Sequence, residues 1–332
     1  MSARFWVILI VIGSLLSLLL APTIGGTDVP LQTLWNASSD ETSRMIFWDI
    51  RLPRAVLAWV AGAGLAVAGM AFQAMFRNAL ATPFTLGVSS GASMGATLGI
   101  RLGLSFSLLG LSATSLCAML GALLAISLVY GLTRLNHTFS NAAMLLAGVA
   151  VNFFFSSIIL LIQYTSNYYD TFRILRWLMG GLQLIGFDST VQVLIFVAIG
   201  VLVLAYFIHE LNLLTLGSEL AMSRGLHVQR LKTILFLTVS IMVGAIVAVC
   251  GPIGFIGLMV PHICRLIIGS DHRHLLPAVA FFGGGFLVVC DTLARTIFFP
   301  TELPVGIITS FLGGPFFLWL LLRPNKNGSV IV

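Results

Sequence analysis

Long apolar runs alternate with short polar connections along almost the whole chain. Because an α-helix rises 1.5 Å per residue, about 20 apolar residues are needed to cross a bilayer. Ten segments follow this pattern, at about 5–21, 54–75, 84–100, 104–132, 142–164, 190–208, 231–250, 256–268, 276–295 and 305–322. The pattern predicts an all-α, polytopic membrane protein of about ten transmembrane helices, in which residues 1–332 form a single transmembrane domain.

One stretch, residues 250–277, is as apolar as the others but is interrupted by several Gly and Pro residues. A broken segment at membrane depth needs other protein or a water-filled cavity around its freed backbone groups. We interpret it either as a kinked packing helix or as the moving wall of a permeation pathway. The connection at 78–87, five predicted spans earlier, is interrupted in the same way, which indicates a weak inverted repeat with its two turns on opposite sides of the membrane.

Composition supports the membrane assignment and excludes several functions. Hydrophobic residues make up 58% of the chain and charged residues 8%, whereas soluble domains carry about 25% charged residues. The four cysteines show no C-x-x-C spacing, so we expect buried thiols rather than disulfides or a metal site. The chain has no phosphate-binding Walker A motif. We therefore predict no catalytic residues, no cofactor in this chain and no enzyme activity of its own.

The distribution of basic residues predicts the orientation, because cytoplasmic loops are enriched in Lys and Arg. With both termini in the cytoplasm, the inner side carries ten basic and three acidic residues, and the outer side seven basic and eight acidic ones. We expect a multi-pass protein of the cell (inner) membrane. The inner basic residues are Arg4, Arg77, Arg134, Arg224, Arg230, Lys232, Arg265, Arg273, Arg323 and Lys326.

Three long connections are expected to carry structure outside the membrane. Residues 22–53 and 165–189 would lie on the periplasmic side, the second as a short interfacial helix or as a lid. Residues 209–230 form the long cytoplasmic loop. Its sequence predicts a helix from Ser218 to about Arg224 that Gly225 ends. This helix would lie on the membrane surface or dock a soluble partner.

Several motifs occur in an order that resembles the FecCD-type permeases, the membrane subunits of ABC importers for iron-siderophores, haem and cobalamin. The resemblance covers residues 45 to 323 or so. The motifs are Arg-Leu-Pro-Arg at 51–54, the small-residue run at 62–69, Asn-Ala-Leu-Ala-Thr-Pro at 78–83, Leu-Gly-Val-Ser-Ser-Gly-Ala at 86–92, the stretch 251–262 with Arg265, Asp291-x-x-x-Arg295, Glu-Leu-Pro-Val-Gly at 302–306 and Gly-Gly-Pro-Phe-Phe at 313–317.

The resemblance implies a type II ABC importer permease fold and a set of partners. A second copy of the permease, a cytoplasmic ABC ATPase dimer, a periplasmic substrate-binding protein and the lipid bilayer are expected, and nucleic acid is not. ATP and Mg would sit on the partner ATPase. Arg51, Arg54 and Arg295 match the arginines that receive acidic groups of the binding protein, a task suited to the guanidinium fork. An alternative for Arg295 is an i,i+4 ion pair with Asp291.

Further residues receive roles through the same resemblance. Leu220 and Arg224 depart from the family's coupling motif, and Ala79 replaces its usual proline after Asn78. We interpret His262 as a structural residue rather than a metal ligand. The ATPase-coupling residues would be Leu216, Gly217, Glu219, Ala221, Gly225 and Leu226. A cytoplasmic gate would use Asn78, Leu80, Ser140 and Asn141. Apart from the resemblance, the polar residues of the span at 142–164 predict a pathway lining of Asn152, Ser156 and Gln163, with small-residue helix packing as the alternative for the serines Ser156 and Ser157.

The predicted function is the permease step of ATP-driven import by alternating access. The cargo would be a metal chelate, with an iron-siderophore as the main expectation and haem or cobalamin as alternatives. A more distant alternative is an ion-coupled secondary transporter. Such a transporter usually needs a carboxylate inside the membrane, and the acids nearest to the spans, Asp291 and Glu210, stand at span ends.

Overall fold

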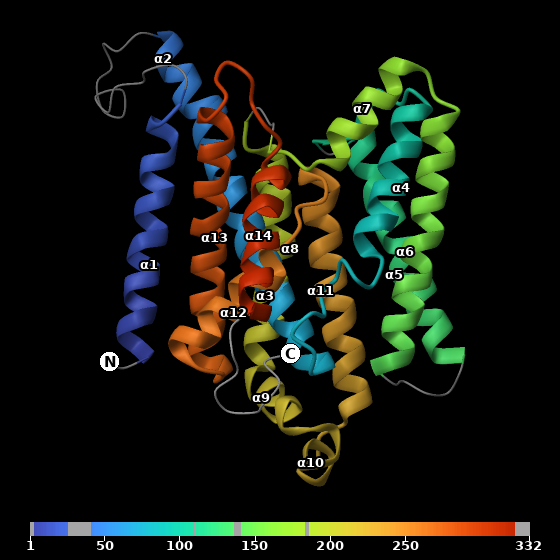
Figure 1. The fold of residues 1–332 in the computed structure, drawn as a ribbon, viewed down its shortest axis with the longest axis vertical. Helices are drawn as coiled ribbons and strands as arrows, with labels where there is room; N and C mark the ends of the chain where they lie inside the picture. The colour runs from blue at the N-terminus through green and yellow to red at the C-terminus, as the bar shows by residue number, and fades with distance from the viewer. Residues whose placement is uncertain (1–2, 26–40, 109, 136–140, 183–185, 323–332) are drawn as a thin grey trace.

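The computed structural model describes residues 3–25, 41–108, 110–135, 141–182 and 186–322. Most of these residues form long helices that stand side by side (Figure 1). The long helices are α1 (Ala3–Leu20), α3 (Leu52–Phe76), α4 (Val88–Arg101), α5 (Ala113–Leu135), α6 (Asn141–Tyr164), α8 (Asp188–Tyr206), α11 (Val228–Cys250), α12 (Ile256–Ile268), α13 (His272–Thr296) and α14 (Val305–Leu322).

Shorter elements lie at the two ends of this bundle, which we call the α7 end and the α10 end (Figure 1). The α7 end carries α7 (Tyr168–Leu178), α2 (Glu41–Met45) and a π-helix (Ile46–Arg51) that runs into α3. The α10 end carries α9 (Ile208–Leu216) and α10 (Ser218–Ser223). A 3-10 helix (Ala21–Thr23) follows α1, and β1 (Ser107–Leu108) pairs antiparallel with β2 (Leu111–Ser112).

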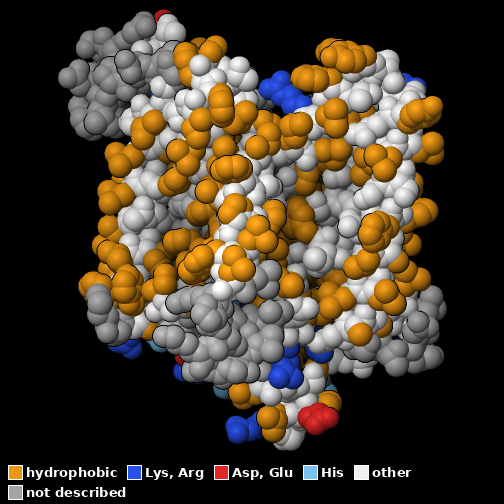
Figure 2. Space-filling view, viewed as in Figure 1, with side chains coloured by type: hydrophobic (Ala, Val, Ile, Leu, Met, Phe, Trp, Pro, Cys, Tyr) orange, Lys and Arg blue, Asp and Glu red, His pale blue; other side chains and the backbone are white. Residues whose placement is uncertain are grey.

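The helices confirm the all-α membrane fold that the apolar pattern predicted. Each of the ten predicted spans corresponds to one of the ten long helices. Seven of the helices in the described residues are long and apolar enough to cross a membrane, and α12 and α14 are shorter apolar helices. Figure 2 shows hydrophobic side chains over most of the visible face, with basic side chains gathered toward the two ends. Such a surface requires lipid around it.

One expectation about element boundaries was wrong, and one helix was not predicted. The span expected at 104–132 begins only at Ala113, because Ser107–Leu108 and Leu111–Ser112 pair as the short strands β1 and β2. The long connection at 209–230 contains a second helix, α9, which leads directly into α10. The helix at 165–189 is confirmed as α7, whose N-cap residue Asn167 accepts a hydrogen bond from the backbone amide of Asp170 at 2.7 Å.

Helix α3 lies at the centre of the bundle. In its most apolar 18-residue stretch, 89% of the residues are buried, whereas the corresponding share is 22% in α1 and in α6. Glycines allow neighbouring helices to approach it closely. A Cβ atom at Gly62 would overlap the carbonyl oxygen of Gly283 on α13, and one at Gly69 would overlap the carbonyl oxygen of Gly257 on α12. Small residues at helix crossings replace the hydrophobic driving force that lipid cannot supply. The small-residue run at 62–69 therefore fixes α12 and α13 against α3.

Candidate functional site

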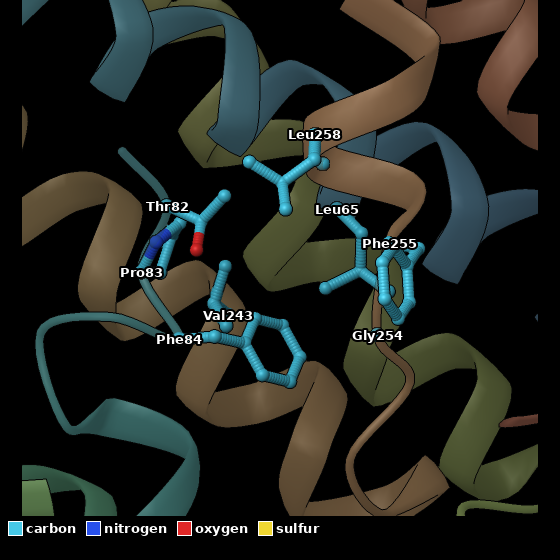
Figure 3. Close-up of a pocket in the computed structure, with 9 residues that line it drawn as sticks. Leu65, Thr82, Pro83, Phe84, Val243, Gly254, Phe255 and Leu258 are labelled. Atoms are coloured by element: carbon cyan, nitrogen blue, oxygen red, sulfur yellow. The ribbon is translucent and has the colours of Figure 1, made fainter. Parts of the chain in front are cut away.

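The two Gly/Pro-interrupted segments start from opposite ends of the bundle and meet at membrane depth. Helix α3 ends toward the α10 end and α11 ends toward the α7 end, and the chain after each helix turns back into the bundle (Figure 1). Both segments line one cavity of about 110 Å³ (Figure 3). Its lining is uncharged and consists of Leu65, Thr82, Pro83, Phe84, Val243, Gly254, Phe255, Gly257 and Leu258.

The first segment satisfies its own backbone groups inside the bundle. The hydroxyl of Thr85 donates to the carbonyl oxygen of Thr82 at 2.6 Å and accepts from the Thr82 amide at 3.2 Å. The amide of Gly87 donates to the carbonyl oxygen of Phe84 at 3.2 Å, and Gly87 then begins α4 with φ +82°. Non-helical backbone is tolerated at this depth only when such partners exist.

The second segment places Phe255 in a conformation that side chains rarely adopt. Phe255 has φ +67° and directly precedes α12. Backbone strain of this kind costs on the order of 1–3 kcal/mol and persists where the surrounding structure imposes it. The ring of Phe255 occupies the space that a Cβ at Gly313 of α14 would need, and it lies 6.4 Å from the ring of Phe317. The packing of α14 against the break therefore holds Phe255 in place.

The three arginines expected to dock a partner come together at the α7 end with two acidic residues. We call this group the arginine cluster; it comprises Arg51, Arg54, Asp291, Arg295 and Glu302. Arg54 donates to Asp291 through Nε at 3.1 Å and Nη2 at 2.9 Å, and to Glu302 through Nη1 at 2.7 Å. Arg295 lies 3.1 Å from Asp291 through Nε, which is the i,i+4 pair considered as its alternative.

These arginine side chains are largely covered. Arg51, Arg54 and Arg295 are 6%, 7% and 6% exposed. Arg295 also donates to the carbonyl oxygen of Ala21 at 3.3 Å, and Arg51 donates to that of Pro22 at 3.3 Å. All three border a cavity of about 220 Å³ together with Glu302. The side chains thus lie at the expected end of the molecule, but they face this cavity rather than open solvent.

At the other end, α10 closes as the sequence predicted. The amide of Leu226 donates to the carbonyl oxygen of Ala221 at 3.1 Å, and the amide of Gly225 donates to that of Met222 at 2.9 Å. This pair of bonds is a Schellman motif, and Gly225 adopts the left-handed conformation that the motif needs, with φ +82°. Gly217 separates α10 from α9 with φ +124°.

Most apolar side chains of this region face away from the bundle. Leu216, Leu220 and Met222 are 61%, 59% and 55% exposed, and Glu219 between them is exposed too, whereas Ala221 is fully buried. We call the four exposed residues the α10 surface. Ala221 anchors the short helix, so the apolar residues stay available on its outer side. The α10 surface is thus an exposed apolar patch at a polar end of the bundle.

The predicted gate residues are only partly brought together. Asn141, at the start of α6, donates to the carbonyl oxygen of Phe76 at 3.1 Å and accepts from Nζ of Lys232 at 2.8 Å. It therefore joins α6 to the end of α3 and to α11. Asn78 accepts from the amide of Leu80 at 2.8 Å within its own turn, and Leu80 is exposed. Ser140 lies outside the described residues.

The remaining expected residues occupy defined places. Asn152, Ser156 and Gln163 are half-buried along one side of α6, next to its buried stripe. The ring of His262 lies on α12, 6.2 Å from that of Phe316. Among the described residues, no three His, Cys, Asp or Glu side chains gather as a metal site would require.

Sequence reasoning missed two sets of contacts. Arg265 of α12 donates to the side-chain oxygen of Gln73, whose amide in turn donates to the carbonyl oxygen of Gly257 at 3.2 Å. Asn212 of α9 bonds the start of α13. Gln73 and Arg265 stood in the sequence as polar residues on apolar helices, which was a signal for a partner. Nothing in the sequence singled out Asn212.

Comparison with known proteins agrees with this architecture. A model of the FecCD transport family matches residues 9–323. The hemin transport system permease protein HmuU of Yersinia pestis is 41% identical over 308 residues, covering 92% of this chain and 92% of that protein. The vitamin B12 import system permease protein BtuC of Yersinia enterocolitica is 40% identical over 311 residues, covering 93% of this chain and 90% of that protein.

A solved structure shows the same fold over the whole chain. It is described as an inward-facing conformation of a metal-chelate type ABC transporter, and it superposes with a TM-score of 0.84 at 27% identity. The match covers 97% of this chain and 100% of the other. The broken segments, the membrane-spanning bundle and these relatives agree: the chain belongs to the FecCD transport family, as a membrane-spanning permease of an ABC importer.

Proposed function

We propose that this permease passes a bulky metal chelate into the cell by ATP-driven alternating access, with an iron-siderophore as the first cargo to test. The observation that carries the proposal is the meeting of the two broken segments around an uncharged cavity. An element that is not locked into one continuous helix can rearrange at membrane depth, as transporter helices do. Haem and cobalamin remain the alternative cargoes, since relatives named for them are about equally similar.

The α10 surface is proposed as the contact with a cytoplasmic ABC ATPase dimer. Its exposed leucines and methionine lie around one carboxylate, and helix α10 itself projects beyond the bundle (Figure 1). A docked partner would bury Leu216, Leu220 and Met222, which supplies the hydrophobic energy of association. This role requires the α10 end to lie in the cytoplasm. We therefore propose that the protein lies in the cell (inner) membrane with both termini in the cytoplasm and the α7 end facing the periplasm.

The arginine cluster is proposed as the contact with a periplasmic substrate-binding protein. Because Arg54 already holds Glu302, an acidic side chain of the partner would have to displace that carboxylate from the cavity. Glu302 is the exposed member of the pair, with 42% of its side chain accessible, whereas Asp291 is buried. Exchange is therefore expected at Glu302 and not at Asp291.

A second permease copy would complete the pathway as a homodimer.

Uptake into proteoliposomes tests the proposal. The permease is reconstituted with its ATPase and substrate-binding protein partners, and accumulation of a ferric siderophore, haem and cobalamin is measured with ATP inside the vesicles. We expect ATP-dependent accumulation of one chelate that persists when ion gradients are collapsed. Accumulation that follows a proton or sodium gradient without ATP would refute the proposal and favour a secondary transporter.

A further inference from the structure

One side chain of α9, Asn212, is bonded to the first turn of α13. The side-chain amide of Asn212 donates to Oδ1 of Asp271 at 2.9 Å. Its side-chain oxygen accepts from the backbone amide of His272 at 3.0 Å and lies 2.6 Å from Nδ1 of the same residue. Both ends of the Asn212 amide are thus engaged, and every partner belongs to the start of α13.

The turn that Asn212 holds is itself well anchored. Asp271 caps α13 by accepting from the backbone amide of Arg273 at 3.0 Å, and its carbonyl oxygen accepts from the amide of Leu275 at 2.9 Å. The Arg273 amide and the Asn212 side chain hold the pKa of Asp271 below its ordinary value, so the residue is a carboxylate at neutral pH. Asn212 is therefore hydrogen-bonded to the capped first turn of a helix and not to an unstructured loop.

On its other side, α9 leads directly to the α10 surface. The two helices share Gly217, which ends α9 and precedes α10. Leu211 and Leu214 are buried and pack α9 against the bundle. A displacement of α10 by a bound partner is passed to α9 through this shared residue. Apolar packing alone is non-directional and permits sliding, whereas the hydrogen bonds of Asn212 require a fixed alignment.

Helix α13 reaches from this contact to the opposite end of the molecule. It begins at His272 beside α9 and carries Asp291 and Arg295 of the arginine cluster near its other end. Gly283, midway along, lies against Gly62 of α3. Helix α13 is packed on α3 by the Gly62–Gly283 contact and by the Arg54–Asp291 ion pair, so we expect a shift of its first turn to be passed on to the α3–α13 pair.

We propose that Asn212 is a positioning residue that holds α9 in register with α13 and so couples movement of the α10 surface to the α7 end of the α3–α13 pair. This inference rests on the proposed function, because the movement is attributed to the nucleotide cycle of the ATPase partner. Loss of the amide leaves α9 packed by its buried leucines but able to slip along α13. Hydrolysis of ATP then continues without moving cargo.

The test uses the complete reconstituted transporter and measures the number of ATP molecules hydrolysed per chelate imported. Asn212→Leu removes all three polar contacts, and Asn212→Asp places a second carboxylate against that of Asp271, which is repulsive. We expect both variants to keep the ATPase bound and to raise this ratio at least about fivefold, the lower range of coupling between sites. Thr215→Ala is the matched control, since the Thr215 hydroxyl bonds only within α9, to the carbonyl oxygen of Asn212 at 2.7 Å.

A double variant separates positioning from general damage to the fold. In Asn212→Asp with Asp271→Asn, the carboxylate and the amide exchange places, so the contact across the two helices re-forms with reversed polarity. We expect the ratio to return to within about twofold of the unaltered transporter. An unchanged ratio in both single variants, or no rescue in the double variant, would overturn the inference. Failure of the unaltered transporter to import any chelate with ATP would instead refute the proposed function.

Discussion

Arg54 and Asp291, which lie 237 positions apart in the sequence, form a buried two-pronged ion pair between the start of α3 and the last turns of α13. The Asp291 carboxylate is shared with Arg295, so one buried acid serves two buried guanidinium groups. Such a pair is retained for geometry more readily than for stability, because removing water from both charges offsets most of their attraction. Its geometric effect here is to tie α3 and α13, which also meet at Gly62 and Gly283, together at the α7 end.

Removing the shared carboxylate should destabilise the protein strongly. Asp291→Asn leaves Arg54 and Arg295 close together with only Glu302 to balance them. Breaking a buried pair from one side costs about 3–5 kcal/mol. We expect a clear drop in the melting temperature of the purified permease in detergent.

The matched control is Asp170→Asn, at the same end of the molecule. Asp170 lies 3.8 Å from Arg101, whose side chain is 42% exposed, and ion pairs that water reaches contribute about 0–1 kcal/mol. Equal melting temperatures for the two variants would contradict the structural importance of Asp291.

Glu302→Gln should strengthen docking of the binding protein. The substitution removes the charge that competes for Arg54 and leaves the guanidinium available to an acidic side chain of the partner. We expect the dissociation constant of the permease–binding protein complex to fall several-fold. It is measured from the binding of the substrate-binding protein to permease that is immobilised in nanodiscs. A tenfold fall in the dissociation constant would correspond to about 1.4 kcal/mol.

Glu41→Gln provides the control, because Glu41 is an exposed acid of α2 at the same end. It changes the net charge equally without contacting the arginine cluster. If both substitutions altered the affinity alike, long-range charge would explain the effect, and exchange at Arg54 would be wrong.

A single methyl group at Gly69 should disturb the contact of α3 with α12. The added Cβ would overlap the carbonyl oxygen of Gly257, which is backbone and cannot rotate away. Overpacking typically costs about 1–3 kcal/mol, and we expect the upper part of that range for Gly69→Ala. Thermal unfolding in detergent measures the effect.

Gly13→Ala is the comparison for Gly69→Ala, since nothing lies within 4 Å of a Cβ at Gly13 on α1. It should be neutral or slightly stabilising, because alanine is a better helix former than glycine. Equal losses at both positions would mean that helix crossing distance is not what selects glycine at 69.

Gly225→Pro should abolish co-purification of the ATPase. Proline fixes φ near −65° and lacks an N–H, whereas Gly225 has φ +82° and donates to the carbonyl oxygen of Met222. The substitution therefore breaks the Schellman motif that orients the α10 surface. Glu219→Lys, which reverses the one charge of that surface, should have a similar effect. We expect at least about a tenfold loss of bound ATPase, equivalent to roughly 1.4 kcal/mol.

Gly103 offers an unusually close control for this substitution. It ends α4 at the α7 end with φ +63°, through amide bonds from Gly103 to Ile100 and from Leu104 to Gly99. Gly103→Pro thus breaks the same motif on the opposite side of the membrane. Retention of the ATPase in Gly225→Pro, or its loss in Gly103→Pro, would be inconsistent with docking on α10.

Most of the fold could be predicted because each membrane span is determined by residues that are close together in the sequence. Each span needs its own run of apolar residues, and each helix satisfies its backbone internally, so length and hydropathy suffice to place it. The exceptions were places where local signals were ambiguous. The sequence from 107 to 112, which contains strands β1 and β2, is about as apolar as the helix that follows it. Helix α9 lies in a connection for which one helix was already predicted.

The candidate site could be predicted only in part. The sequence by itself determined the helices, the two breaks and the closure of α10 by Gly225, since these depend on residues a few positions apart. Tertiary structure alone decided that Arg54 pairs with Asp291 and Glu302, that Asn212 holds the start of α13, and that both breaks line one cavity. Those contacts join residues far apart in the chain, and their partners are chosen by helix packing, which no local pattern of residues encodes.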